Sequence, residues 1–375
     1  MKKIFLFSVF YLLSSTFFCT GCVSQRNKFL PYPVKGVCYN PVPIGEGYDY
    51  NFWQDADGLA EIDGKLMQEM GVNMVRFYQP GKDAQQTKKL IQQLYKKYKI
   101  RSAVGHHLGF WGRYLDYADP RYQQKIEKEV LEMVQSLKDE KGISLWILGN
   151  ENNRSFDNEL RGWSSQELNK IENGYKRSQK KAAIYYKFVN RLARKIHRID
   201  KRPVALGNAG LPFLDIAKEL IPDVDMLAVT VYRGDSFGNF FVQAKKIKKP
   251  FFFSEFGCDA YNVLLGKEDE QSQVLFLNNQ WAEIEKNLDP QGCLGGIIFE
   301  WADEWWKHNQ WDRDSYVIHN CEASWTSGSY YFDAAAGRNM NEEWWGIVSL
   351  QKREGGMTDK RIPRKAYYEL QKIWK

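Results

Sequence analysis

Short runs of apolar and β-branched residues alternate along the chain with segments whose apolar positions recur every three or four residues. Such runs predict buried strands, and the longer periodic segments predict helices. The eight predicted strands are 34–39, 72–78, 100–106, 143–150, 202–207, 226–232, 250–255 and 294–301. Regular strand–helix alternation indicates a parallel sheet with right-handed crossovers. Eight such units favour an α/β fold closed into a (β/α)8 TIM barrel. With six or seven units, an open parallel sheet would be an equally good interpretation.

Helix boundaries are marked by capping residues. The predicted helices begin near Asp57, Asp83, Pro120, Gly174, Leu211, Asn239, Ser272 and Pro363. Asp119 before Pro120 places a capping carboxylate ahead of a proline at the first helical position. The segment that follows carries its apolar residues on one stripe: Ile126, Val130, Met133, Val134 and Leu137.

Three loops are much longer than the others: 40–55, 152–173 and 305–362. They follow the first, fourth and eighth predicted strands, and the first and third are rich in aromatic residues. In barrel enzymes the loops at the carboxyl ends of the strands build the active site. We therefore expect these long βα loops to form the walls of a binding cleft.

The N-terminus has the pattern of a targeting segment. Lys2 and Lys3 precede a mostly apolar run at 4–18, and Gly21-Cys22 resembles a bacterial lipobox. This predicts a signal peptide at 1–21, lipidation of Cys22, a tether at 22–32 and a single catalytic domain at 33–375. The protein is then exported and anchored by lipid to the bacterial cell envelope, at the outer or cell-surface membrane. A plain secretory signal and an uncleaved anchor helix are the alternatives.

Charge and cysteine content bear on nucleic-acid binding, disulfide bonds and metal sites. The formal net charge is +7, and the basic residues are spread along the predicted helices. Solvated helix faces explain this spread better than a nucleic-acid surface does, so we expect no nucleic-acid partner and a monomer. Export would expose the cysteines to an oxidising compartment, where Cys258 and Cys321 are the expected pair. No cysteine or histidine spacing indicates a metal site.

Two stretches share one design, an apolar run that ends in a glycine and a glutamate. One is Ile143 to Glu151, and the other is Pro250 to Cys258 with Glu255 near its end. The two glutamates are about 100 residues apart, or three βαβ units of about 35 residues. Both therefore lie at the carboxyl ends of predicted strands, the fourth and the seventh, and can face the mouth of the barrel. Two carboxyl groups across a cleft are the machinery of glycoside cleavage.

The motifs Gly149-Asn150-Glu151 and Ser254-Glu255-Phe256-Gly257 resemble those of the retaining glycoside hydrolases of clan A, whose catalytic glutamates lie on barrel strands 4 and 7. The chain looks most like the glycoside hydrolase family 2 catalytic barrel and the β-1,3-glucanosyltransferase family 72. The resemblance covers roughly residues 35–374. The jelly-roll domains usual in family 2 and the full cysteine pattern of family 72 are both missing from the sequence, so neither family's substrate carries over.

The resemblance implies roles for individual residues. Glu151 matches the acid/base and Glu255 the nucleophile. Arg76 matches an arginine on strand 2 that supports the nucleophile, and Asn150 matches an asparagine that binds the sugar 2-hydroxyl. A surface ion pair is the alternative for Arg76.

Further matches concern the walls of the cleft. Tyr232 matches a tyrosine that hydrogen-bonds the nucleophile, and Trp301 matches an aromatic residue that stacks on the sugar. Trp305 is a second aromatic candidate. His106 is the histidine candidate for substrate binding, with His107 as its neighbour in the same role. Core packing is the alternative for the aromatic residues, and a structural role is the alternative for both histidines.

The expected function is a retaining β-glycoside hydrolase or transglycosylase that acts on an oligosaccharide or polysaccharide. Carboxyl groups alone perform this chemistry, so no cofactor is expected. Metal binding by the two glutamates is disfavoured because no Asp/His cluster accompanies them. A serine hydrolase lacks its Gly-x-Ser-x-Gly motif here. A non-catalytic carbohydrate-binding surface lipoprotein on the same scaffold is the remaining alternative.

Overall fold

The computed structural model describes residues 29–55, 58–158, 160–324, 339–353 and 358–375. The predicted signal peptide 1–21, the lipidation candidate Cys22 and the tether residues up to 28 lie outside them. Within the described end of the tether, Leu30 packs against the cluster of side chains inside the barrel. This end of the predicted tether is therefore part of the folded structure.

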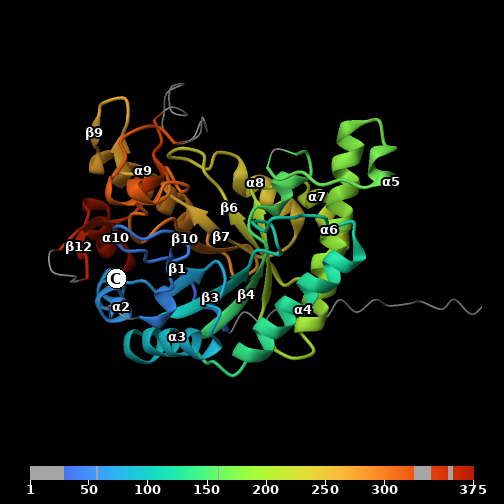
Figure 1. The fold of residues 1–375 in the computed structure, drawn as a ribbon, viewed down its shortest axis with the longest axis horizontal. Coiled ribbons are helices and arrows are strands. Elements are labelled where there is room, and N and C mark those ends of the chain that lie inside the picture. The colour runs from blue at the N-terminus through green and yellow to red at the C-terminus, as the bar shows by residue number, and fades with distance from the viewer. Residues whose placement is uncertain (1–28, 56–57, 159, 325–338, 354–357) are drawn as a thin grey trace, which may run out of the picture.

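Eight parallel strands form a closed barrel (Figure 1). In chain order they are β1 (Val34–Cys38), β2 (Met74–Phe77), β3 (Arg101–His106), β4 (Ile143–Leu148), β5 (Val204–Ala209), β6 (Met226–Thr230), β7 (Phe251–Phe256) and β10 (Cys293–Ile298). Strand β1 pairs with both β2 and β10, which closes the sheet. The predicted (β/α)8 TIM-barrel fold is confirmed, and every strand overlaps its predicted range.

Helices surround this barrel (Figure 1). They are α2 (Leu59–Met70), α3 (Ala84–Tyr98), α4 (Pro120–Leu137), α6 (Gly174–Ile196), α7 (Leu214–Leu220), α8 (Phe240–Ala244), α9 (Glu270–Lys286) and α10 (Lys365–Trp374). The side chains of Asp83, Asp119 and Asn173 accept backbone N–H bonds at the starts of α3, α4 and α6. These caps satisfy amide groups that have no partner within the helix, and they explain why the starts were predictable.

Side chains along each strand alternate between two buried layers. Met74, Leu145 and Phe252 belong to the cluster that fills the barrel, whereas Val75 and Trp146 belong to the layer under the helices. Because both faces are buried, the strands appear in the sequence as continuous apolar runs.

The connections between the barrel strands and the helices contain short elements that the sequence pattern did not predict. They are the helix α5 (Gln166–Asn169), the hairpins β8 (Tyr261–Asn262) with β9 (Lys267–Glu268) and β11 (Val348–Gln351) with β12 (Lys360–Pro363), and the 3-10 helices η2 (Phe52–Gln54), η3 (Asn152–Ser155), η4 (Lys245–Ile247), η5 (Arg313–Val317) and η7 (Glu342–Trp344). A buried bidentate ion pair ties the segment after β10 to the start of α10. In it, Arg364 donates to both carboxylate oxygens of Asp303, at 2.7 and 2.9 Å.

The expected disulfide between Cys258 and Cys321 is wrong, because the structure keeps the two as separate thiols. Cys258 is buried after β7, with its Sγ 3.3 Å from the carbonyl oxygen of Asp259. Cys321 is exposed, and its Sγ lies 3.6 Å from the carbonyl oxygen of His319. Among the described residues, no helix is both long enough and apolar enough to cross a membrane.

Candidate active site

A β-bulge turns Glu255 into the mouth of the barrel. Phe253 faces the helices, so simple alternation along β7 would turn Glu255 outward too. The pairing with β6 instead shifts here, because Val229 lies opposite Phe253 while the next residue, Thr230, lies opposite Glu255. Ser254 is the extra residue in β7, and bulges of this kind re-aim a side chain.

Three donors hold the Glu255 carboxylate, which is 6% exposed. Arg76 donates from Nη1 to Oε1 at 2.7 Å, and Tyr78 donates to the same oxygen at 2.9 Å. Tyr232 donates to Oε2 at 2.8 Å. Charge-assisted hydrogen bonds of this kind fix the orientation of a buried carboxyl group. This arrangement brings together the side chains predicted from strands β2, β6 and β7.

Arg76 is itself fixed from several directions. It is 1% exposed, and its Nη1 also donates to the carbonyl oxygen of Ser254 at 2.9 Å. Its Nη2 donates to Oδ1 of Asn150 at 2.7 Å. The guanidinium carbon lies 4.4 Å from the centre of the Tyr78 ring, within cation–π range. Arg76 therefore joins the ends of β2, β4 and β7, and the surface ion pair considered as an alternative is wrong.

The loop after β4 carries Glu151 in a left-handed conformation, with φ of 58°. Gly149 precedes it with φ of 85°, and a Cβ there would lie 2.4 Å from the hydroxyl of Tyr185. Only glycine fits such a position easily. The Asn152 side chain then closes the turn by accepting the backbone N–H of Asn150 at 2.6 Å.

Two asparagines that the sequence did not single out anchor this loop. Asn152 donates to the carbonyl oxygen of His107 at 3.0 Å and to the hydroxyl of Tyr117 at 2.6 Å. Asn153 accepts the backbone N–H of Ala209 at 2.7 Å and donates to its carbonyl oxygen at 3.1 Å. The left-handed Glu151 is thus held from β3 on one side and β5 on the other, as strained backbone at functional sites usually is.

Glu151 has a different electrostatic environment from Glu255. Burial and the nearby charge of Glu255 raise the pKa of Glu151 from 4.5 to about 7. Arg154, with Nη1 3.2 Å from Oε2 of Glu151, opposes this shift, and Glu342 adds to it. A carboxyl group with this pKa still carries its proton near neutrality and can donate it.

Of the two adjacent histidines, the structure turns His107 toward the site and His106 away. His106 Nε2 lies 3.9 Å from the Glu129 carboxylate on α4, so its expected role in substrate binding is wrong. The ring of His107 is buried and stacks on Tyr78, with the ring centres 5.8 Å apart. Its Nδ1 has no hydrogen-bond partner within the described structure. Adjacent strand residues point in opposite directions, and the sequence did not fix which one faced inward.

Trp301 does not reach the site either. It is 1% exposed, and its ring packs outside the barrel against Tyr367 of α10, with the ring centres 6.3 Å apart. The inward aromatic residue is Phe299, whose ring lies 6.4 Å from Tyr232 and 5.5 Å from Trp345. Strand β10 ends at Ile298, so the alternation that would turn Trp301 inward is lost beyond it.

Trp305 is held in a stack of rings. Its ring lies 4.5 Å from that of His319 at an interplanar angle of 12°, and His319 stacks in turn on Trp344. One face of Trp305 is therefore covered by protein. The expected role of Trp305 in sugar binding stays a prediction.

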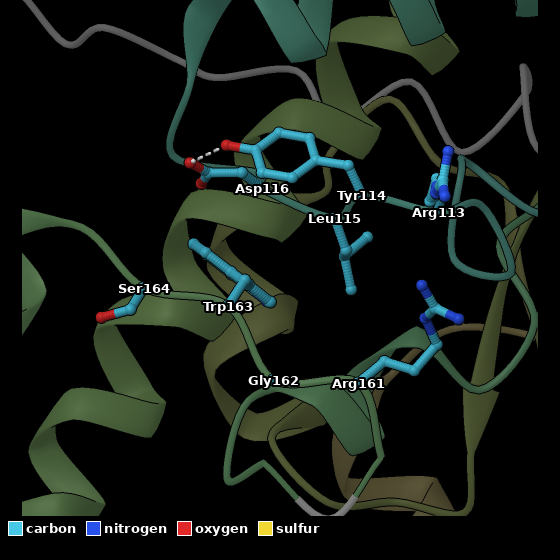
Figure 2. Close-up of a pocket in the computed structure, with 8 residues that line it drawn as sticks. All are labelled: Arg113, Tyr114, Leu115, Asp116, Arg161, Gly162, Trp163 and Ser164. Carbon is cyan, nitrogen blue, oxygen red and sulfur yellow. Dashed lines mark hydrogen bonds between the residues drawn. The ribbon is translucent and has the colours of Figure 1, made fainter.

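A separate hollow of about 390 Å³ lies between the loops that follow β3 and β4 (Figure 2). Figure 2 shows Arg113 and Arg161 on one side of it, with Tyr114 and Asp116 across from them, joined by a hydrogen bond of 3.1 Å. Neither of the two glutamates lines it.

The site also contains residues that sequence reasoning missed. Tyr78 directly follows β2 and lies within the predicted strand 72–78. Because it comes two residues after Arg76, the two side chains face the same side of the strand, and the sequence alone could have indicated this. Trp345 lies far along the chain in the segment after β10, and no local pattern marked it. No group of three or more His, Cys, Asp or Glu side chains is placed to hold a metal ion in the ranges that the structure describes. Carboxyl groups in such contrasting surroundings can serve in proton transfer or as nucleophiles.

The buried position of Trp301 predicts a stability effect. Trp301→Ala should lower the free energy of unfolding by about 3–5 kcal/mol, because it leaves a cavity under α10. Urea denaturation measures this. Trp311→Ala is the matched control, since Trp311 is 92% exposed and should change stability by only about 0.5 kcal/mol or less. If Trp301→Ala unfolds with the same urea midpoint as the parent protein, Trp301 is not buried under α10.

The surroundings of Glu151 predict its titration. Carbon-13 NMR of labelled glutamate should show the Glu151 carboxyl titrating near pH 7. Arg154→Met removes the positive charge that lowers this pKa, so the midpoint should rise. Glu342→Gln removes a negative charge that raises it, so the midpoint should fall. A Glu151 midpoint close to 4.5, or shifts of the opposite sign, would rule out this account of the site.

No family model matches the sequence, and no curated protein matches it. Solved structures do match. A β-glucuronidase from Bacteroides uniformis has a TM-score of 0.59 at 16% identity, over 92% of this chain and 35% of that one. A GH2 β-galacturonidase from Eisenbergiella tayi, bound to galacturonate, has a TM-score of 0.56 at 17% identity, over 92% and 51%. A β-D-glucuronidase from Dictyoglomus thermophilum has a TM-score of 0.54 at 16% identity, over 92% and 50%.

This chain therefore spans between a third and about half of the length of these proteins. At this level of identity the likeness is one of fold. It extends over nearly all of the present chain, and it establishes that the chain has the TIM-barrel fold of these proteins.

Proposed function

We propose that this protein is a retaining β-glycoside hydrolase or transglycosylase that works through a glycosyl-enzyme intermediate. One observation carries the proposal: two carboxyl groups share the barrel mouth, one held by Arg76 and the other buried with its pKa raised to about 7. Paired carboxyl groups in opposite environments are the mark of glycoside cleavage. The names of the structural neighbours, β-glucuronidases and a β-galacturonidase, agree with this reaction class.

In the first step, Glu151 donates its proton to the glycosidic oxygen while a carboxylate oxygen of Glu255 attacks the anomeric carbon. The bond between that carbon and the glycosidic oxygen breaks, and an ester joins the sugar to Glu255. In the second step, the ionised Glu151 takes a proton from a water molecule or from a sugar hydroxyl. The oxygen of that acceptor attacks the anomeric carbon and releases Glu255 as a carboxylate, which gives net retention.

The supporting residues follow from their contacts. Arg76, Tyr78 and Tyr232 orient Glu255 and stabilise its negative charge before attack and after release. Because Oδ1 of Asn150 accepts from Arg76, its amide nitrogen is left to donate to the sugar 2-hydroxyl. Such a bond strengthens in the transition state and contributes to the rate.

Substitution of the glutamates tests the proposal. Glu151→Ala should lower turnover by about 10²–10⁴-fold, as expected for loss of an acid/base catalyst, and Glu255→Ala should abolish it. The assay is incubation with a panel of β-glucans and related oligosaccharides, with product lengths followed over time. Products longer than the starting sugar identify transfer, and shorter ones identify hydrolysis.

Glu132→Ala on the exposed face of α4 is the matched control, and it should retain parental activity. Circular dichroism of each variant confirms that the fold survives. Near-normal activity of Glu255→Ala on a glycan that the parent cleaves would refute the assignment of the nucleophile.

A further inference from the structure

A second group of charged side chains lies beside the carboxyl pair, in the segment after β10. Lys307 Nζ lies 2.7 Å from Oε2 of Glu304 and 3.0 Å from Oε2 of Glu342. Asn40, which follows β1, donates to Oε1 of Glu304 at 2.6 Å. Glu300 lies close enough for Glu304, Lys307 and Glu342 to affect its titration. We call Glu300, Glu304, Lys307 and Glu342 the rim cluster.

Glu300 has an unused hydrogen-bonding group. Its side chain belongs to a residue that is 2% exposed, and its Oε1 has no hydrogen-bond partner within the described structure. A buried polar atom without a partner costs free energy unless something else satisfies it. Burial and the charge of Glu304 raise the pKa of Glu300 well above its usual range. A protonated carboxyl both donates and accepts, as a sugar hydroxyl does.

Contacts connect the rim cluster to the carboxyl pair. Lys307 Nζ lies 4.2 Å from the centre of the Phe299 ring. Phe299 contacts Tyr232, whose hydroxyl binds Glu255. The charge of Glu255 also acts on Glu342. A sugar ring placed over Glu255 would therefore have the rim cluster at one edge.

The charges of the rim cluster disfavour a carboxylate on that sugar. The cluster has three carboxyl groups and one ammonium group, and two of those carboxyl groups already bind the ammonium. A further carboxylate would be brought out of water next to these acids without a cation of its own. Burying an unpaired charge, or placing like charges together, costs several kcal/mol. A neutral hydroxyl or hydroxymethyl group meets no such penalty.

We propose that the rim cluster is the part of the site that recognises the sugar ring, and that it selects β-glycosides whose sugar carries no carboxylate. Glu300 binds a sugar hydroxyl, while Glu304 and Glu342 neutralise Lys307 and exclude uronides. This inference rests on the proposed function for its location. It departs from the structural neighbours, which are uronidases by name.

The test measures binding without turnover. In the Glu151→Gln background, ligand-observed NMR compares methyl β-glucoside with methyl β-glucuronide, and the matching galactose and galacturonic acid pair. In each pair the two sugars differ only at carbon 6. We expect at least one neutral sugar to bind more tightly than its uronide by roughly tenfold or more, the size of a lost charged interaction. Tighter binding of the uronides, or no binding by either pair, would overturn the proposal.

Two variants in the same background assign the effect to the rim cluster. Glu300→Ala should weaken binding of the neutral sugar by roughly tenfold. Glu304→Gln combined with Glu342→Gln frees Lys307, so the preference should shift toward the uronide by a similar factor. Glu322→Gln is the control in the same segment, because the Glu322 side chain is 82% exposed. Thermal melting of each variant shows whether it is folded.

The outcomes separate this inference from the proposed function. A parent protein that turns over uronides faster than neutral glycosides would contradict the rim cluster alone. A parent protein that binds neutral glycosides through Glu300 but cleaves none of the glycans in the panel would contradict the hydrolase alone. If the folded Glu304→Gln and Glu342→Gln double variant still prefers the neutral sugar as strongly as the parent background does, the charges of the rim cluster do not exclude uronides.

Discussion

The buried ion pair between Arg76 and Glu255 is the interaction on which the site depends. A guanidinium that is 1% exposed must be paired, and here its partners are the Glu255 carboxylate, the Ser254 carbonyl and the Asn150 amide. Removing one partner of such a pair typically costs about 3–5 kcal/mol. The pair therefore holds the carboxyl ends of β2, β4 and β7 in one arrangement at the barrel mouth.

The proposed chemistry rests on the contrast between the two glutamates. Glu255 has three donors, whereas Glu151 has burial, a like charge nearby and one arginine that only partly compensates. The backbone supports this contrast: a β-bulge turns Glu255 inward, and a left-handed turn fixed by Asn152 and Asn153 presents Glu151. The rim cluster extends the same principle, because its carboxyl groups cancel the charge of Lys307.

The sequence predicted the barrel, its eight strands and most helix starts because these features are local. Runs buried on both faces mark the strands, and caps such as Asp83 and Asp119 mark the helices. The grouping of Arg76, Asn150, Tyr232 and Glu255 was also predicted, through a family resemblance at the strand ends. The errors have two causes: the sequence did not fix which of His106 and His107 faces inward, and alternation is lost beyond the end of β10, where Trp301 was chosen instead of Phe299. Asn152, Asn153 and Trp345 act through contacts distant in sequence, which no local pattern reveals.

Covalent labelling tests the central claim most directly, that Glu255 is the carboxylate that attacks the anomeric carbon. A neutral 2-deoxy-2-fluoro-β-glycoside with a good leaving group slows release of the intermediate, and peptide mass mapping then locates the attached sugar. We expect a single label on Glu255, and none in Glu255→Ala. A label on another residue, or turnover of the parent sugar with no label formed, would contradict the account.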